Sequence, residues 1–274
     1  MSKTASKSVQ VKKASGEYEP FSEEKVRASL KRVGVQKGVA DDVIKILEKE
    51  LYDGITTHEI YKHVFEHLRS RGVHLASKYN LKRAVMSLGP SGYPFEKFFA
   101  KILAEEGFKV KVGETVQGRC VDHEVDIVAQ KGGKRYMVEA KFHNRTGLKT
   151  DTKVALYVYG RFLDISQADG FEEGWLVTNT RVTREARRYS SCVGIKVISW
   201  DYPQNFSLRY LVEKTGLYPV TALETLSQSD KQTLLEEDIV TCKELLKNLT
   251  LIPKSKRVKV KAEAQKICGD KAEK

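Results

Sequence analysis

The chain has 274 residues, of which 41% are hydrophobic and 31% charged, as is typical of a globular protein with one large domain or two to three smaller ones. No apolar run approaches the roughly 20 residues of a membrane span, the first residues lack the apolar centre of a signal peptide, and the four cysteines form no CxxC pair. We therefore expect a cytoplasmic protein without membrane contact, zinc or disulfides, and the net charge of +12 favours a polyanionic partner, most often nucleic acid.

Residues 10–90 read as a small, mainly helical domain behind a disordered basic tail at 1–9. A short β-like segment opens the domain at 9–21. Amphipathic patterns then predict helices over 22–33, 40–51, 56–70 and 75–88. The third of these begins with a capping box, Thr56 followed by Glu59. The Gly/Pro cluster at 89–94 marks a domain boundary.

The pattern changes to α/β between residues 93 and 202. Aromatic and aliphatic residues at core spacing predict a helix over 94–108, which precedes a hairpin at 122–144. A strand at 174–179, a helix at 183–192 and a strand at 194–200 then favour a parallel pair inside a mixed sheet. Short helices are expected between 203 and 251, and a disordered basic tail over 252–274.

The hairpin gathers unusual charge on one side. A two-residue turn at Gly132-Gly133 sets Asp126 opposite Glu139, with Cβ atoms roughly 5 Å apart, and Glu124 opposite Lys141. A solvated charged face, neutralised by the lysine, is one interpretation. Because opposed carboxylates repel, a hard divalent cation is the interpretation that we favour.

In that second interpretation, Lys141 orients or deprotonates an attacking water, or stabilises a charged transition state. Glu96, one turn into the preceding helix, is a candidate further ligand or holder of the water.

Glu96, Asp126 and the Glu139-Ala140-Lys141 run resemble the motif of the PD-(D/E)XK nuclease superfamily. The longer stretch over about 110 residues, including the order of its elements, resembles the Mrr-like restriction endonuclease branch. The resemblance implies an α/β, restriction-endonuclease-like mixed sheet flanked by helices. It also implies Asp126 and Glu139 as ligands of Mg²⁺ or Mn²⁺ and Lys141 as the catalytic lysine, while the neighbouring His123 and His143 are more often incidental in such sites.

The first 80 residues resemble an ATP-cone, a regulatory module that binds ATP or dATP. A hairpin rich in lysine and glycine, facing a lysine on a helix, offers cations and close backbone approach to a triphosphate. The candidate nucleotide-binding residues are Val11, Lys12, Lys13, Gly16, Lys25 and Tyr79. The alternative is a helical domain that has lost its ligand or only mediates oligomerisation.

Residues 223–246 are similar to a helix-hairpin-helix unit or to the helical domain at the end of the RNA polymerase α subunit. Such units present backbone amides to DNA phosphates through a hairpin that contains glycine. Here Glu237-Asp238 occupies that position, so contact with protein is an equal alternative to DNA binding.

Together these features predict a Mg²⁺-dependent DNA endonuclease that is regulated by adenine nucleotide and acts as a homo-oligomer. A nuclease specific for DNA junctions and a non-catalytic, nucleotide-responsive DNA-binding protein are the alternatives. No Walker-type loop is present, which favours nucleotide sensing over motor work. Candidate contacts to the DNA backbone, with a solvated helix face as the equal alternative, are Arg181, Arg184, Arg187 and Arg188.

Overall fold

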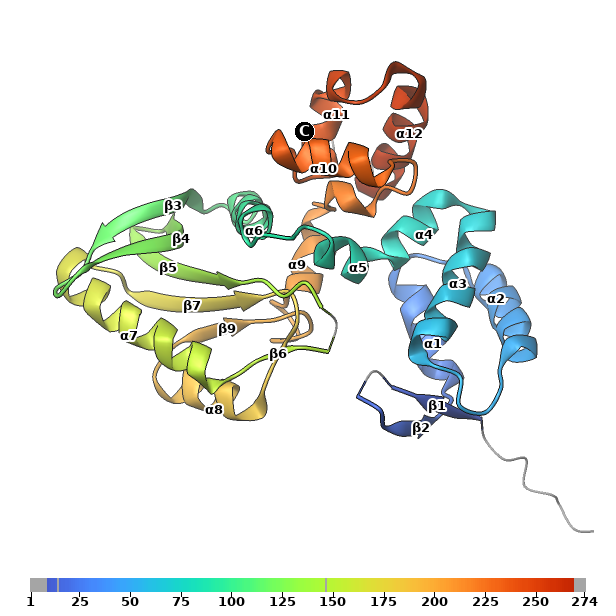
Figure 1. Ribbon diagram of the computed structural model, residues 1–274, viewed down its shortest axis with the longest axis horizontal. Coiled ribbons are helices and arrows are strands. Elements are labelled where there is room, and N and C mark those ends of the chain that lie inside the picture. The colour runs from blue at the N-terminus through green and yellow to red at the C-terminus, as the bar shows by residue number, and fades with distance from the viewer. Residues whose placement is uncertain (1–8, 14, 146, 269–274) are drawn as a thin grey trace, which may run out of the picture. The chain divides into compact units, whose positions relative to one another are not determined.

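A computed structural model describes residues 9–13, 15–145 and 147–268 (Figure 1). The chain divides into two compact units, Met1–Leu81 and Lys82–Lys274, each of which is described by itself. Of the expected amino-terminal tail, residues 1–8 lie outside the described part of the chain. No helix of the described residues is long and apolar enough to span a membrane.

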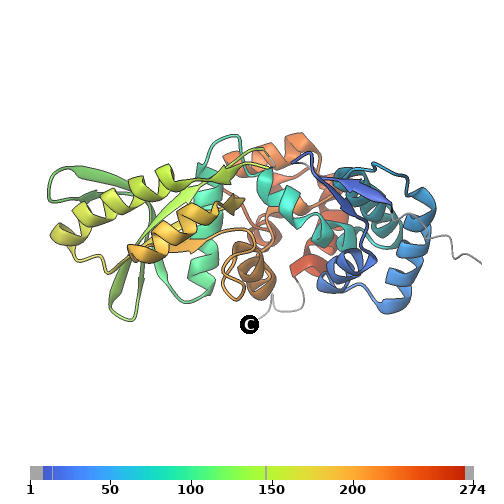
Figure 2. The ribbon, with the colours of Figure 1, turned by 90° about the horizontal axis from the view of Figure 1, so that it is seen from below.

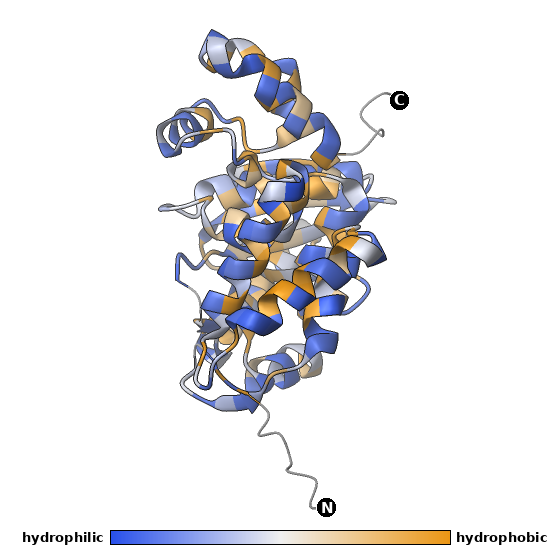
Figure 3. Ribbon diagram, turned by 90° about the vertical axis from the view of Figure 1, so that its right-hand side faces the viewer, coloured by the Kyte–Doolittle hydropathy of each residue, from blue (hydrophilic) through white to orange (hydrophobic). Residues whose placement is uncertain are grey.

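The first unit is a two-stranded antiparallel sheet followed by four helices. Its elements are β1 (Gln10–Lys12), β2 (Tyr18–Pro20), α1 (Glu23–Arg32), α2 (Lys37–Glu50), α3 (Thr57–Arg71) and α4 (Val73–Tyr79). The predicted capping box of Thr56 and Glu59 is present at the start of α3. Apolar and polar residues alternate along the helices (Figure 3), and the apolar ones, such as Leu30, Leu47 and Leu68, are fully buried.

The fourth predicted helix, 75–88, is interrupted. α4 ends at Tyr79, and α5 (Leu81–Met86) begins after Asn80. The N–H of Asn80 turns back to the carbonyls of Ala76 and Lys78, and its side chain accepts a hydrogen bond from the Tyr61 hydroxyl at 2.5 Å. Asparagine has a lower helix propensity than alanine or leucine, which agrees with a break at this position. The division between the two units falls inside α5.

A five-stranded mixed sheet forms the centre of the second unit, in the spatial order β3-β4-β5-β7-β9. The first three strands are antiparallel neighbours, and the last three run parallel. The mixed sheet and its parallel pair are therefore confirmed. The strands are β3 (Lys109–Gln117), β4 (Asp122–Lys131), β5 (Lys134–Lys141), β7 (Glu173–Thr178) and β9 (Lys196–Ile198).

Helices cover both faces of this sheet. α6 (Tyr93–Glu105) lies on one face, and α7 (Thr152–Asp169) and α8 (Arg184–Cys192) lie on the other (Figures 1 and 2). A short parallel pair, β6 (Lys149–Thr150) with β8 (Arg181–Val182), lies beside them. β3 was not predicted from the sequence, although Val110, Val112 and Val116 alternate with polar residues along it; only Val116 of this edge strand is buried.

The hairpin of β4 and β5 has the predicted turn and register. Gly132 and Gly133 have φ values of 60° and 84°, and the pairing runs as predicted from Lys131↔Lys134 to Ile127↔Val138. The second face of the hairpin is not an open charged face, however, because α7 covers part of it.

The expected pairing of Asp126 with Glu139, and of Glu124 with Lys141, is not formed. The ladder stops one residue earlier, since β5 continues beside β7 up to Lys141 while β4 stays with β3. Asp126 remains close to β5 by another contact, because its Oδ2 accepts a hydrogen bond from the N–H of Ala140 at 2.7 Å.

The carboxy-terminal part forms the expected short helices and then a further one. The expected basic tail over 252–274 is wrong for its described residues, because α12 packs Val260, Ala264 and Ile267 into the interior. The spacing of these three residues is helical, but the surrounding lysines mask it in the composition. Residues 269–274 lie outside the described part. The helices are α9 (Leu208–Thr215), α10 (Gln228–Glu236), α11 (Cys242–Lys247) and α12 (Arg257–Cys268).

Ion pairs hold this helical part against α6. The acidic hairpin after α10 contributes Asp238, which has a φ of 62° and pairs with Lys97 of α6. Its carboxylate therefore contacts a helix of the same unit. Two further pairs on α6 are Lys101 with Glu244 at 2.5 Å and Glu105 with Lys243 at 3.1 Å, and Glu106, directly after the helix, pairs with Lys214 at 2.6 Å.

Candidate functional site

The four predicted catalytic residues come from three elements that meet at one end of the sheet. β4 supplies Asp126, the carboxy-terminal end of β5 supplies Glu139 and Lys141, and the first turn of α6 supplies Glu96. Parallel pairing fixes Glu139 beside Leu176 of β7. The three carboxylates are partly buried, whereas Lys141 is exposed to solvent.

Burial and mutual repulsion perturb all three carboxylates. Burial, with a contribution from Asp126, raises the pKa of Glu139 to about 7. Burial also raises the pKa of Glu96 to about 7, and repulsion from Asp126 and Glu139 adds to the effect. The pKa of Asp126 is raised by burial as well, although the N–H of Ala140 opposes the change. Such a concentration of poorly compensated negative charge is typical of a cation site or an acid–base site.

Arg161 is a residue of the candidate site that the sequence analysis did not select. Its side chain on α7 is only 10% exposed, and its Nη1 lies 2.5 Å from Oε2 of Glu139. The arginine offsets part of the negative charge and fixes the rotamer of Glu139. A signal was available, because Arg161 is the one charged residue in the otherwise apolar run 154–163.

The carboxylates fit a hard divalent cation that is only partly held by protein. One oxygen of Glu139 faces Arg161 and one oxygen of Asp126 faces Ala140, so the second oxygen of each would meet a cation. No cluster of three or more His, Cys, Asp or Glu ligands occurs among the described residues. Mg²⁺ is commonly bound by one or two carboxylates, with water and substrate phosphate oxygens completing the shell, so two carboxylates suffice.

The two histidines that flank the motif each hold neighbouring structure. Nε2 of His123 lies 2.9 Å from Oδ2 of Asp164 on α7. Nε2 of His143 lies 3.0 Å from the hydroxyl of Thr150, and burial lowers the pKa of this histidine. Both contacts anchor the ends of strands β4 and β5.

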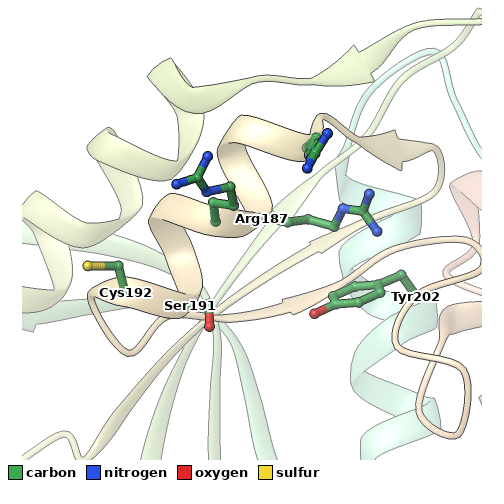
Figure 4. A pocket seen from close by; sticks show the side chains of 6 residues that line it. Arg187, Ser191, Cys192 and Tyr202 are labelled. Carbon is green, nitrogen blue, oxygen red and sulfur yellow. The ribbon is translucent and has the colours of Figure 1, made fainter.

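Three of the four predicted arginines line one pocket of about 530 Å³ on α8 (Figure 4). The guanidinium of Arg187 lies over the ring of Tyr202, 5.1 Å from its centroid, and its buried Nε has no hydrogen-bond partner among the described residues. Arg181 lies apart from the lining, exposed in β8. The pocket is lined by Arg184, Arg187, Arg188, Ser191, Cys192 and Tyr202.

In the first unit, the predicted lysines converge on a carboxylate that the sequence analysis did not select. Nζ of Lys13 and Nζ of Lys25 lie 2.6 and 3.0 Å from Oε2 of Glu19. Hydrogen bonds from Lys13 and then Lys25 lower the pKa of Glu19. Lys12 is exposed on β1, and Gly16 has a φ of 87° in the hairpin turn.

The two apolar candidates, Val11 and Tyr79, pack in or against the core of that unit. Val11 is 5% exposed in the main apolar cluster. Tyr79 packs against the same cluster and stacks on Tyr61, with ring centroids 5.2 Å apart, and burial raises its pKa.

Comparison with known proteins adds the family. A restriction endonuclease model of the Mrr type matches residues 89–204, and an ATP cone domain model matches residues 9–85. An uncharacterized protein of Archaeoglobus fulgidus is 40% identical over 177 residues, which cover 62% of this chain and 99% of that protein. The chain belongs to the Mrr-like restriction endonucleases and carries an ATP cone.

The chain also resembles solved structures, of which AF1548 and MspJI are two. A protein of unknown function, AF1548, is 38% identical, covers 65% of the Mrr-like chain and 99% of its own, and superposes with a TM-score of 0.57. The MspJI restriction endonuclease in complex with a 27-mer oligonucleotide is 15% identical, covers 60% and 36% of the two chains, and has a TM-score of 0.38. A model described as AF1548-like, C-terminal matches residues 218–268 of the Mrr-like chain, which include the unpredicted α12.

Proposed function

We propose that this protein is a divalent-metal-dependent DNA endonuclease of the cytoplasm, with cleavage controlled by ATP or dATP at its cone. The observation that supports the activity best is the meeting of Glu96, Asp126 and Glu139 beside Lys141, with the pKa of two carboxylates raised to about 7. All four residues lie inside the part of the chain that the restriction endonuclease model matches. The four cysteines are scattered in the sequence without a CxxC pair, which supports a reducing compartment.

Each side chain has a role in this proposal. Asp126 and Glu139 would hold Mg²⁺ or Mn²⁺, which when bound would polarise the scissile phosphodiester and offset the charge that develops during attack by water. Lys141, exposed two residues after Glu139, orients the water or offsets the charge on the phosphate. Glu96, with its pKa near neutrality, accepts a hydrogen bond or a proton from that water. Arg161 keeps Glu139 in one orientation.

The arginine pocket of α8 supplies the contact to DNA. Guanidinium groups bind phosphates bidentately, and three of them, from Arg184, Arg187 and Arg188, line this pocket. Cleavage of both strands needs two copies of the site or two successive events, so we expect a homo-oligomer on the DNA. In the cone, Lys13 and Lys25 exchange Glu19 for the phosphates of the nucleotide.

The first test is cleavage of plasmid and linear duplex DNA with Mg²⁺ by wild type, Lys141→Ala and Asp126→Asn. We expect each variant to lose about 10²-fold or more in rate. Lys109→Ala, an exposed lysine on the edge strand β3, is the matched control and should cleave as wild type does. Unchanged cleavage by both site variants would remove this assignment.

Two further measurements separate the alternatives. Cleavage of a four-way junction much faster than of the matched duplex would favour a junction-specific nuclease. Absence of Mg²⁺ and Mn²⁺ binding in calorimetry would favour a DNA-binding protein without catalysis.

A further inference from the structure

The segment that leaves the cone is part of the catalytic domain's interior. α5 begins at Leu81, the last residue of the first unit, and its remaining residues belong to the second unit. Linkers between independent domains are usually polar and exposed. Here Ala84, Val85 and Leu88 are almost fully buried, and the hydroxyl of Thr221 donates a hydrogen bond to the carbonyl of Ala84 at 2.6 Å. This connection is therefore built into the packing of the second unit.

One contact of this segment lies at the end of β5, the strand that carries Glu139 and Lys141. A Cβ added at Gly89 would fall 2.6 Å from Cε1 and 3.1 Å from Cζ of Phe142, so the phenylalanine ring rests on the glycine backbone. Phe142 is the residue that follows Lys141, and its ring also contacts Phe95 of α6, with centroids 5.7 Å apart. The backbone at Gly89 thus supports the end of β5.

A second contact holds the next residue. Asn179 is fully buried, its Oδ1 accepts from the N–H of His143 at 2.9 Å, and its Nδ2 donates to the carbonyl of His143 at 2.8 Å. These two bonds fix the orientation of the amide, because the N–H needs an acceptor and the carbonyl needs a donor. Nδ2 also lies 3.2 Å from Sδ of Met86, the last residue of α5.

The segment therefore reaches both residues that follow Lys141. Gly89 contacts Phe142 directly, and Met86 contacts His143 through the side chain of Asn179. Metal-dependent phosphodiester cleavage depends on positions to about 1 Å, and an error of that size costs about 10²-fold in rate. A small movement of this segment is thus sufficient to switch the site without changing its residues.

We propose that α5 and residues 87–92 transmit the nucleotide state of the cone to the strand that carries Glu139 and Lys141, with Asn179 and Phe142 as positioning residues. This inference rests on the proposed function, namely a nuclease regulated through its cone. Since the route acts on the end of β5 and not on the arginine pocket, the nucleotide changes kcat and leaves the affinity for DNA nearly unchanged.

The test uses the full chain with Mg²⁺, duplex DNA and either ATP or dATP. Calorimetry measures nucleotide binding, single-turnover cleavage measures the ratio of rates with and without nucleotide, and hydrogen exchange follows the peptide 138–145. In wild type we expect the nucleotide to change both the rate and the exchange of this peptide. Met86→Ala should bind nucleotide within about twofold of wild type, yet respond to it by less than about twofold in rate.

Two variants complete the design. Gly89→Ala forces Phe142 to move, so we expect kcat to fall about tenfold or more at unchanged KM. Ser87→Ala, exposed in the same segment, is the control and should keep the full nucleotide response. Two outcomes would overturn the route alone. In the first, nucleotide binds and alters cleavage while the hydrogen exchange of peptide 138–145 stays constant. In the second, Met86→Ala keeps the full response of the cleavage rate to nucleotide. Failure of nucleotide to bind would overturn the regulation by the cone, and the route with it.

Discussion

Glu96→Gln should stabilise the metal-free protein at alkaline pH. Burial and repulsion raise the pKa of Glu96 from its ordinary 4.5 to about 7, so ionising this carboxyl in the folded state costs free energy at pH 8. The full difference corresponds to about 3 kcal/mol at roughly 1.4 kcal/mol per pH unit. Because the side chain is only half-buried, solvent screens part of this cost, and we expect a gain of about 1–2 kcal/mol.

The sign of the pH dependence follows from the same shift. An acid whose pKa is higher in the folded than in the unfolded state favours folding most at low pH, and this contribution is lost as the pH rises through about 7. At pH 5 the wild-type carboxyl is protonated, so Glu96→Gln and wild type should be nearly equal in stability. At pH 8 with saturating Mg²⁺, the gain should shrink, since the cation compensates the carboxylates.

The assay is urea unfolding in EDTA at pH 5 and pH 8, followed by tryptophan fluorescence. The only two tryptophans, Trp175 and Trp200, are buried in the second unit, so their signal reports on that unit. Glu237→Gln, an exposed glutamate, is the control and should change little at either pH. Equal stability of Glu96→Gln and wild type at pH 8, or an equal gain at both pH values, would refute the reasoning.

Three further predictions concern the rest of the chain. Ile267→Ala should destabilise the second unit by about 2–4 kcal/mol in urea unfolding because Ile267 is 1% exposed, whereas Val258→Ala, 80% exposed on the same helix, should change it by less than about 0.5 kcal/mol; equal effects would contradict the packing of α12. Glu19→Gln should raise the affinity of the cone for ATP in calorimetry, since two lysines no longer have a carboxylate partner, and weaker binding would make Glu19 part of the nucleotide site. Arg187→Ala should weaken DNA binding in anisotropy titrations and lower the slope of log affinity against log salt by about one, while an unchanged slope would assign this arginine to packing.

Much of the geometry of the candidate site was predictable because its pieces are local in sequence. A glycine pair fixes the turn, the period of two fixes which residues share a face, and the spacing of Glu139 and Lys141 then follows. The same logic could not show that the pairing of β4 with β5 ends at Ile127. That end depends on the other neighbours in the sheet, because β4 stays with β3 while β5 continues beside β7.

The remaining site residues depend on contacts between distant parts of the chain. Arg161 meets Glu139 only after α7 has packed on the sheet, and Asn179 meets His143 across 36 residues. Composition also misled at the carboxy terminus, where lysines on the exposed side of α12 conceal the buried stripe that ends at Ile267. In each case tertiary packing, and not local propensity, decides the outcome.

The central claim is that Asp126 and Glu139 form a cation site that drives cleavage. Its most direct test is the single-turnover cleavage rate of a linear duplex at increasing Mg²⁺, compared between wild type and Asp126→Asn, with Mn²⁺ binding measured on both proteins. We predict a saturable Mg²⁺ dependence in wild type, with cation binding and cleavage lost together in the variant. Cleavage in EDTA, or equal Mg²⁺ dependence in the two proteins, would contradict the claim.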